Sequence, residues 1–355
     1  MIRIGVIGLG YWGPNLVRCF SELSDCKVTL VCDRDVERLV RLTDRFPGIR
    51  PTESVDDVLA GDMVDAVVVA TPTRTHYEIA ARALDSGLHT FVEKPLATSG
   101  AECRDLIQRA AANGVRLFVG HVFLHSAPVH KLRELIDNDE LGEVCYVSST
   151  RLNLGPVRQD VNALWDLAPH DISIILHLLG EQPTAVSCTG LAHLNRRVHD
   201  VCNLTLHFRD DKLGIVHVSW LDPHKKREMT VVGTKKMAVY DDLQQEKVKV
   251  YNKGIDAPAH SSDFGQFHYS YRYGDTYSPW LNENEPLKAE CAAFVRSIID
   301  GRDALTNGAN GLQIVEVLEA ADESLRSGAS RVELGSAAAE NGAPAELEML
   351  AVAHG

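Results

Sequence analysis

Residues 2–13 have the sequence Ile-Arg-Ile-Gly-Val-Ile-Gly-Leu-Gly-Tyr-Trp-Gly, and this stretch decides the fold class. Its apolar first half is typical of a buried strand, and the pattern Gly-x-Gly-x-x-Gly then leads into a helix. The first glycine permits a tight turn, the second lets the backbone approach a pyrophosphate, and the third lets the helix pack on the strand. N–H groups at the start of the helix attract the negative charge. We therefore expect a dinucleotide to be bound by Gly8, Gly10, Tyr11, Trp12 and Gly13.

Asp33 ends the next apolar run, residues 28–32, about twenty residues beyond the glycines. A carboxylate at this place accepts hydrogen bonds from the hydroxyls of the adenosine ribose and repels a 2′-phosphate. The sequence therefore predicts NAD as the cofactor. Arg34 is adjacent and can pair with a 2′-phosphate, so NADP remains a less favoured alternative.

Length and charge limit the possible functions. The chain has 355 residues, with 36 Lys and Arg against 49 Asp and Glu and a net charge of −13. This length predicts two domains, and the acidic balance argues against a nucleic acid or an anionic membrane as partner. No apolar run is long enough to span a bilayer, and the first strand leaves no room for a signal peptide.

The eight cysteines are scattered and form no Cys-x-x-Cys pair, which indicates a reduced, cytoplasmic protein. His121, His125 and His130 match no compact set of metal ligands, so we expect no metal site.

The pattern of elements changes near residue 120. Before it, strands and amphipathic helices alternate, which is typical of an α/β fold with a doubly wound parallel sheet. After it, short turns between strands indicate an α+β unit with an open, mostly antiparallel sheet, followed by an aromatic-rich stretch, 253–280, that we expect to be irregular. We predict a dinucleotide-binding Rossmann domain (1–121), a substrate-binding and oligomerisation domain (122–335) and a disordered tail (336–355).

Lys94 directly follows the fourth core strand, in the run Phe91-Val92-Glu93-Lys94-Pro95. Ligands of open α/β sheets bind beyond the carboxyl ends of the strands, so we expect Lys94 at the cofactor. As a cation it can hydrogen-bond a substrate oxygen, and as an amine it can act as a base. The alternative is a solvated surface lysine paired with Glu93.

A helix near residues 166–179 carries the second group of candidates. If it begins at Asp166, Pro169 falls in its first turn, where the missing N–H costs little. Asp166 and His170 then share one face, and the helix dipole favours the neutral imidazole of a general base. Asp166 either orients this ring or caps the helix, in which case His170 is a surface residue.

Two further groups have the side chains of a ligand site. Arg151 and Asn153 alternate along one strand, and Arg158 follows; arginine forks suit phosphate or carboxylate groups, whereas a solvated strand face is the alternative. Tyr273 lies in the aromatic run 271–279, which suits a sugar or nucleotide and equally suits packing or subunit contacts.

These residues together resemble the Gfo/Idh/MocA oxidoreductases over nearly the whole chain, to about residue 335. The resemblance rests on the glycine turn, the loop Ala70-Thr71-Pro72-Thr73-Arg74-Thr75-His76, the Glu-Lys-Pro run and the pair Asp166 and His170, which matches the family's Asp-x-x-x-His motif. It implies that the lysine lies beside the nicotinamide and that the histidine is the acid/base. It adds as cofactor-binding residues Thr71, Pro72, Thr73, His76, Glu93, Lys94 and Pro95.

Three stretches, residues 151–155, 165–172 and 271–275, are most similar to the UDP-N-acetylglucosaminuronic acid 3-dehydrogenases and related nucleotide-sugar 3-ketoreductases. From this resemblance we expect substrate contacts from Arg151, Asn153, Arg158, Trp165, Asp171 and Tyr273. Such enzymes are usually homodimers or homotetramers built through the open sheets. This chain departs from the family at Asn162-Ala163-Leu164-Trp165, where members often have a glycine-rich lead into the helix.

The resemblance implies NAD-dependent hydride transfer at a secondary alcohol carbon of a sugar, most closely C3 of a nucleotide-activated hexose. We expect His170 to take the hydroxyl proton, Lys94 to stabilise the oxygen, and Asp166 to orient His170. The same groups serve the reverse reduction. Two alternatives remain: an inositol or free-sugar dehydrogenase of the same superfamily, and a non-catalytic protein that senses a dinucleotide.

Overall fold

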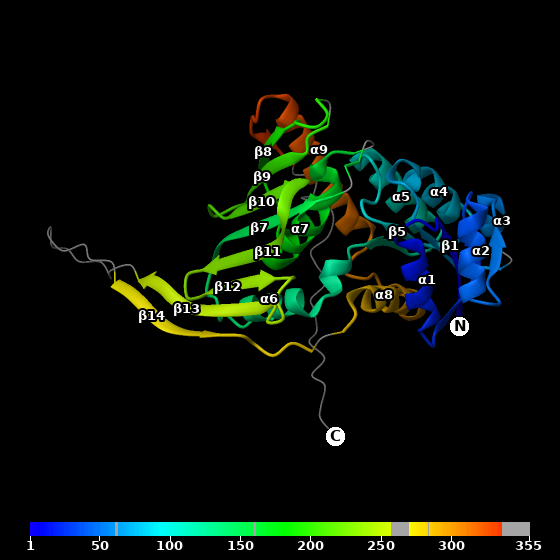
Figure 1. Ribbon diagram of the computed structural model, residues 1–355, viewed down its shortest axis with the longest axis horizontal. Coiled ribbons are helices and arrows are strands. Elements are labelled where there is room, and N and C mark those ends of the chain that lie inside the picture. The colour runs from blue at the N-terminus through cyan, green and yellow to red at the C-terminus, as the bar shows by residue number, and fades with distance from the viewer. Residues whose placement is uncertain are drawn as a thin grey trace, which may run out of the picture.

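The structure is a computed structural model that describes residues 1–60, 63–155, 157–158, 161–196, 198–256, 270–282 and 284–335. Two units lie side by side, each built on one β-sheet (Figure 1). None of the helices in the described part combines the length and apolar character that crossing a membrane requires. The predicted disordered tail, 336–355, lies outside the described residues.

The first sheet has six strands in the order β3-β2-β1-β4-β5-β6, and each neighbouring pair is parallel. This is the doubly wound order of a Rossmann fold and confirms the predicted class. Its inner strands are apolar throughout because helices cover both faces, and all four residues of β4 are buried. The strands are β1 (Ile2–Ile7), β2 (Cys26–Cys32), β3 (Arg50–Thr52), β4 (Ala66–Val69), β5 (His89–Glu93) and β6 (Leu117–Gly120).

Side-chain caps start several of the helices around this sheet. Asp35, Ser54 and Ser99 each accept a hydrogen bond from a backbone N–H of the first turn, which satisfies donors that have no partner within the helix. The helices are α1 (Gly13–Ser21), α2 (Val36–Arg45), α3 (Val55–Leu59), the 3₁₀ turn η1 (Thr73–Thr75), α4 (His76–Asp85) and α5 (Gly100–Ala112).

The second sheet has nine strands in the order β14-β13-β12-β11-β7-β10-β9-β8-β15, antiparallel except for the pair β10 and β7. This confirms the predicted open, mostly antiparallel sheet. The strands are β7 (Val144–Leu154), β8 (Ala185–Leu191), β9 (Val201–His207), β10 (Leu213–Ser219), β11 (Leu221–Gly233), β12 (Met237–Asp241), β13 (Val248–Asp256), β14 (Ser270–Tyr277) and β15 (Val332–Glu333).

The expectation of an irregular stretch over 253–280 is wrong for its described part. Strand β13 continues to Asp256, and β14 pairs with it at the edge of the sheet. Every residue of β14 is exposed or half-buried, so neither face of the strand is buried. The sequence therefore lacks the alternation of apolar and polar residues that predicts a strand with one buried face. In Figure 1 this yellow strand extends away from the first unit.

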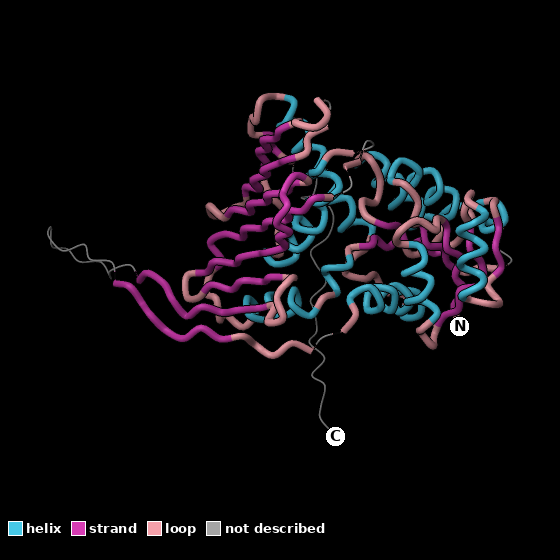
Figure 2. The backbone as a smooth tube through the Cα atoms, viewed as in Figure 1, coloured by secondary structure: helices cyan, strands magenta, loops and turns pink. Residues whose placement is uncertain are grey.

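Helix α7 (Ala163–Leu179) lies between the large sheet and the first unit (Figure 2), and its apolar residues join those of the sheet in one core. Helix α8 packs instead into the first unit, where Phe294 meets Phe20 and Phe91. Part of the chain beyond residue 122 therefore stabilises the dinucleotide-binding unit. The remaining helices are η2 (Val122–His125), α6 (Ala127–Asp137), α7 (Ala163–Leu179), α8 (Pro286–Asp300) and α9 (Gly308–Arg326).

Candidate active site

The glycine turn after β1 has the geometry that a pyrophosphate requires. Gly8 has φ +97°, which other residues rarely adopt, and a Cβ there would lie 2.6 Å from the carbonyl oxygen of Ala70. A Cβ on Gly13 would lie 2.1 Å from the carbonyl oxygen of Gly8. A Cβ on Gly10 would meet nothing within 4 Å. The first and third glycines are therefore needed for packing, whereas Gly10 borders open space.

Asp33 lies at the end of β2, within reach of this turn. Its carboxylate accepts hydrogen bonds from the backbone N–H of Leu9 over 2.6 Å and of Asp35 over 2.9 Å. The guanidinium of Arg38 lies 3.7 Å from it, and Arg34 is exposed. Arg38 also lines, with Gly10 and Tyr11, a cavity of about 420 Å³ beside the turn. The arginine next to Asp33 is thus Arg38, which the sequence interpretation missed.

His76 connects the two loops that the family resemblance assigned to the cofactor. Its Nδ1 lies 2.8 Å from the carbonyl oxygen of Pro95 and its Nε2 2.9 Å from that of Thr71. The ring is buried, and burial lowers its pKa. Pro72 is extended before η1, and Thr73 is buried within it. The imidazole of His76 therefore bridges these two loops.

Lys94 reaches from the end of β5 to the second unit. Its Nζ donates a hydrogen bond to the backbone carbonyl oxygen of Asp166 over 2.7 Å. Burial lowers the pKa of Lys94, against the attraction of Asp166 and Glu93. The neighbouring Glu93 is half-buried, and burial raises its pKa to about 7. The interpretation of Lys94 as a solvated surface lysine is therefore wrong.

Helix α7 begins earlier than predicted, and this changes the role of Asp166. The side chain of Asn162 caps the helix at the N–H of Trp165, so Pro169 lies inside the helix and not in its first turn. Asp166 is neither a cap nor a partner of His170. Its two carboxylate oxygens accept hydrogen bonds from Arg158 over 3.3 Å and from Trp220 over 3.1 Å.

His170 lies one turn beyond Asp166, and its imidazole forms a T-shaped pair with the Phe123 ring, with the two ring centroids 5.0 Å apart. The enclosed Nδ1 has no hydrogen-bond partner among the described residues, which leaves Nε2 as the nitrogen able to reach a ligand. Burial, and next the charge of Lys94, lowers the pKa of His170 well below its usual value. The imidazole is therefore neutral, as a general base must be.

The sequence analysis expected Arg151 and Asp171 to contact the substrate. In the structure the two side chains bind each other instead. Arg151 donates from Nε to Oδ2 over 2.7 Å and from Nη2 to Oδ1 over 3.2 Å, and both residues are buried. The guanidinium also lies over the ring of Phe123, 4.7 Å from its centroid. This ion pair therefore links strand β7 to helix α7 at the residue that follows His170.

The other expected substrate residues are dispersed. Tyr273 is 81% exposed on β14, the edge strand that extends away from the first unit (Figure 1). Trp165 donates from its indole to Asp322 of α9 over 2.6 Å, and it lines a separate groove. Asn153 is half-buried on β7. Arg158, through Asp166, remains next to the site.

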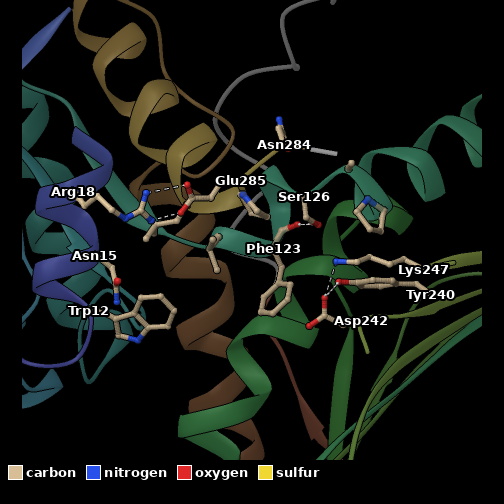
Figure 3. A pocket seen from close by; sticks show the side chains of 15 residues that line it. Trp12, Asn15, Arg18, Phe123, Ser126, Tyr240, Asp242, Lys247, Asn284 and Glu285 are labelled. Atoms are coloured by element: carbon tan, nitrogen blue, oxygen red, sulfur yellow. Dashed lines mark hydrogen bonds and ion pairs between the residues drawn. The ribbon is translucent and has the colours of Figure 1, made fainter. Parts of the chain in front are cut away.

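A cavity of about 440 Å³ opens between the two units (Figure 3). In Figure 3, Trp12 and Arg18 line it from the first unit, Phe123 lies between the units, and the second unit contributes Tyr240 of β12 and, from the turn between β12 and β13, Asp242 and Lys247. Arg18 is paired with Glu285, and the hydroxyl of Tyr240 donates to Asp242 over 3.1 Å. Aromatic rings and hydrogen-bonding groups thus face one space. Neither Lys94 nor His170 is among its lining residues, and Phe123, whose ring contacts that of His170, connects the cavity to them.

Sequence reasoning missed Phe123 and considered His121 only as a metal ligand. His121 directly follows β6 as Lys94 directly follows β5, and this position at the carboxyl end of a strand is the signal that could have identified it. No group of three or more potential metal ligands is present in the described part of the chain.

Two family models match the chain. The model of the oxidoreductase family with an NAD-binding Rossmann fold matches residues 2–121, and that of the GFO/IDH/MocA C-terminal domain matches residues 129–239. An uncharacterised oxidoreductase of Streptococcus pneumoniae serotype 4 is 29% identical over 201 residues, 54% of this chain and 53% of the relative. The matched segment thus spans about half the length of that protein.

Two solved structures have the same fold. The UDP-N-acetylglucosamine 3-dehydrogenase of Acidithiobacillus ferrooxidans is 27% identical over 71% of this chain and 78% of its own. Its structure has a TM-score of 0.79, at 24% identity, over 92% of this chain and 98% of that one. GenD2 from gentamicin A biosynthesis, solved in complex with NAD, has a TM-score of 0.79 at 27% identity, over 94% and 96%.

Proposed function

Because the chain belongs to the Gfo/Idh/MocA oxidoreductase family, we propose that it is an NAD-dependent oxidoreductase acting on a secondary alcohol carbon of a sugar, at C3 of a nucleotide-activated hexose. The observation that carries this proposal is the hydrogen bond from Lys94 to the carbonyl of Asp166. It brings the ammonium of one unit to the helical turn that leads to His170 in the other. The cavity between the two units, lined by aromatic and polar groups that include the Phe123 ring in contact with His170, supports a sugar as ligand.

The residues of the chain have separate tasks in this reaction. The nicotinamide cofactor, when bound, accepts or supplies the hydride. The Lys94 ammonium has three N–H groups, of which one binds Asp166, so others remain to hold the carbinol oxygen and stabilise its developing charge. His170 takes the hydroxyl proton at Nε2 because its imidazole is kept neutral. Reduction of the ketone uses the same two groups in reverse.

The nucleotide-sugar substrate is supported by the name of one relative, the UDP-N-acetylglucosamine 3-dehydrogenase. NAD in preference to NADP is supported by Asp33, whose carboxylate lies at the glycine turn. The single-turnover formation of NADH from NAD, or of NADPH from NADP, tests both points when it is followed by absorbance with a panel of UDP-N-acetylglucosamine, UDP-glucose, dTDP-glucose, glucose and myo-inositol.

The same measurement tests the two reacting groups. Lys94→Ala and His170→Asn are each expected to lower the rate on the order of a hundredfold or more, the usual contribution of a positioned acid or base. His177→Asn is the matched control, since His177 lies two turns further along α7 and should leave the rate unchanged. Full activity in both site variants would refute the proposal.

The panel also separates the alternatives. Equal turnover of free sugars or myo-inositol would indicate a free-sugar or inositol dehydrogenase. NAD binding without turnover of any alcohol would favour a protein that senses a dinucleotide.

We further propose that the protein is a cytoplasmic homodimer or homotetramer assembled through the nine-stranded sheet. Leu191 and Ile215 are exposed on the face opposite α7, where apolar side chains suit a subunit contact. Seven of the eight free cysteines are buried, in keeping with a reducing compartment. Light scattering of the wild type and of Ile215→Asp tests the assembly, since the charge should dissociate it.

A further inference from the structure

A cluster of charged side chains lies on the large sheet where it borders the cavity between the two units. Its cations are Arg151 of β7, Arg227 of β11 and Lys247 of the turn before β13. Its carboxylates are those of Asp171 and Asp242, each paired with at least one of these cations. One positive charge of the cluster therefore has no carboxylate of its own.

Strand register places the two arginines of the cluster side by side. Arg227 pairs with Arg151 across the strands, and the backbone N–H of Asp242 donates to the carbonyl oxygen of Arg227 over 2.9 Å. Residues directly opposite each other in an antiparallel pair share one face of the sheet, and like charges there repel. Asp171 neutralises Arg151 through two hydrogen bonds. Arg227 therefore needs a separate carboxylate, and Asp242 provides it 3.3 Å from Nη1.

Both carboxylate oxygens of Asp242 are occupied by groups other than Lys247. Oδ1 accepts a hydrogen bond from the hydroxyl of Tyr240 over 3.1 Å, and Oδ2 accepts one from Arg227. The ammonium of Lys247 lies 3.9 Å from Oδ1, which is beyond hydrogen-bond distance, and it has no hydrogen bond within the described part of the chain. An ammonium carries three N–H donors, so those of Lys247 remain for a ligand.

Lys247 presents its charge to the cavity and not to the interior of the sheet. Figure 3 shows its side chain extending from the second unit to the cavity that it lines. Phe123 lines the same cavity, and its ring contacts that of His170. Glu228 also borders the cluster, but it is paired with Lys226 over 3.1 Å. The charge of Lys247 is therefore available on the path that leads to the proposed base.

The chemistry of this position suits an oxyanion. The side chain of Lys247 is 31% exposed, and the aromatic residues Trp12, Phe123 and Tyr240 border the cavity. Water screens a charge in such a place less than one in open solvent, so an ion pair formed there is stronger. Sugar hydroxyl groups are uncharged, whereas carboxylate and phosphate groups carry the opposite charge and accept short hydrogen bonds from an ammonium. The cluster therefore favours a ligand that carries an oxyanion.

We propose that Lys247 is a specificity-determining residue of the cavity: its ammonium binds an oxyanion of the substrate, and Arg227 leaves it free to do so by neutralising Asp242. The oxyanion is a phosphate of the nucleotide or a carboxylate of the sugar. That the ligand is the substrate rests on the proposed function, whereas the oxyanion site itself does not.

Calorimetric titration of the full-length protein saturated with NAD tests the site without turnover, since NAD keeps the probes out of the dinucleotide site. The probes are UDP, UDP-glucose, UDP-glucuronate, glucuronate and glucose. In Lys247→Met we expect the anionic probes that the wild type binds to bind about tenfold more weakly, because one charge-assisted contact is lost, and the affinity for glucose to stay the same. The matched control is Lys249→Met, because Lys249 is paired with Glu246 over 3.8 Å and does not line the cavity.

The probes also identify the source of the oxyanion. Weaker binding of UDP and UDP-glucose by Lys247→Met would assign the site to a phosphate. Weaker binding confined to UDP-glucuronate and glucuronate would assign it to a carboxylate. Unchanged affinities for every probe, or no binding of any anionic probe by the wild type, would overturn the proposal.

The role of Arg227 is tested by a pair of variants. Arg227→Met should weaken the same probes, because Asp242 then neutralises Lys247, and adding Asp242→Asn should restore their affinity. A purely structural role would lower the melting temperature without this restoration, and that result overturns the role given to Arg227. If the wild type binds an anionic probe but oxidises no sugar, the proposed function fails and the oxyanion site stands.

Discussion

Lys94 of the first unit and Asp166 of the second are joined by a 2.7 Å hydrogen bond from Nζ to a backbone carbonyl oxygen. Because the acceptor belongs to the backbone of α7, the bond positions the helix itself and not only one side chain. The bonded turn leads directly to His170. The relation between the two units at this point therefore determines the distance between the ammonium and the base.

The pH profile of alcohol oxidation follows from these two groups. The pKa of His170 lies well below 6.5, so the base stays unprotonated in mildly acidic solution, and the rate should fall only well below pH 6.5. Burial also lowers the pKa of Lys94 from 10.5. The alkaline limb of the profile, where the ammonium loses its proton and the rate falls with rising pH, should therefore lie below pH 10.5. In Lys94→Arg the alkaline limb should disappear, because arginine does not deprotonate in this range. An acidic limb at pH 6.5 or above, in kcat/KM measured from pH 4.5 to 10.5, would contradict this account.

Two glycines of the turn should respond differently to the same substitution. Gly10→Ala is expected to melt within about 2 °C of the wild type, since its Cβ meets no atom, but to bind NAD about tenfold more weakly because the methyl enters the cofactor's space. Gly13→Ala should lose about 1–3 kcal/mol of stability through the clash with Gly8. Thermal unfolding and calorimetric titration of NAD measure both effects. Equal melting temperatures of the two variants would disagree with the turn geometry.

Cofactor preference should depend on Asp33 and Arg38. Replacing the carboxylate in Asp33→Ser removes the repulsion of a 2′-phosphate, and the ratio of NADP to NAD affinity should rise about tenfold or more. Arg38 lies 3.7 Å from Asp33, so adding Arg38→Gln should cancel that gain, whereas adding Arg34→Gln should cancel less of it. Dissociation constants for both cofactors test the series. Tighter binding of NADP than NAD by the wild type would show that Asp33 does not select the cofactor.

The Arg151 and Asp171 pair should contribute to stability. Arg151→Met leaves the carboxylate of Asp171 buried without its partner, which is expected to cost about 3–5 kcal/mol in urea unfolding. The double variant Arg151→Met, Asp171→Leu removes both charges and should recover most of that loss. If Arg151 bound the substrate instead, the single variant would raise KM and leave the unfolding midpoint unchanged.

Local patterns predicted most of the fold. Strand β1 forms over the apolar first half of the opening stretch, as expected, because it is a short apolar run that the glycine turn follows. The predicted start of α7 was wrong. A proline suits the first turn of a helix, which placed the start near Asp166, but the side chain of Asn162 caps the helix earlier and Pro169 lies inside it. Strand β14 was missed because neither of its faces is buried.

The partners within the site were less predictable. Arg151 and Asp171 each had side chains suited to a ligand, and their pairing depends on how α7 packs on β7. Asp166 and His170 do share the helix that was predicted, but the carboxylate is drawn to Trp220 at the end of β10. Such contacts join segments far apart in the chain, and no local spacing encodes them.

The sequence by itself determined the phosphate-binding turn, the parallel sheet and the positions of Lys94 and His170, since these depend on residues next to one another in the chain. Tertiary structure alone decided that Lys94 meets the Asp166 carbonyl and that His121 lies beside Lys94. The reason is physical: strand register and domain packing are set by the burial of whole faces, and they bring together side chains that no short-range preference connects.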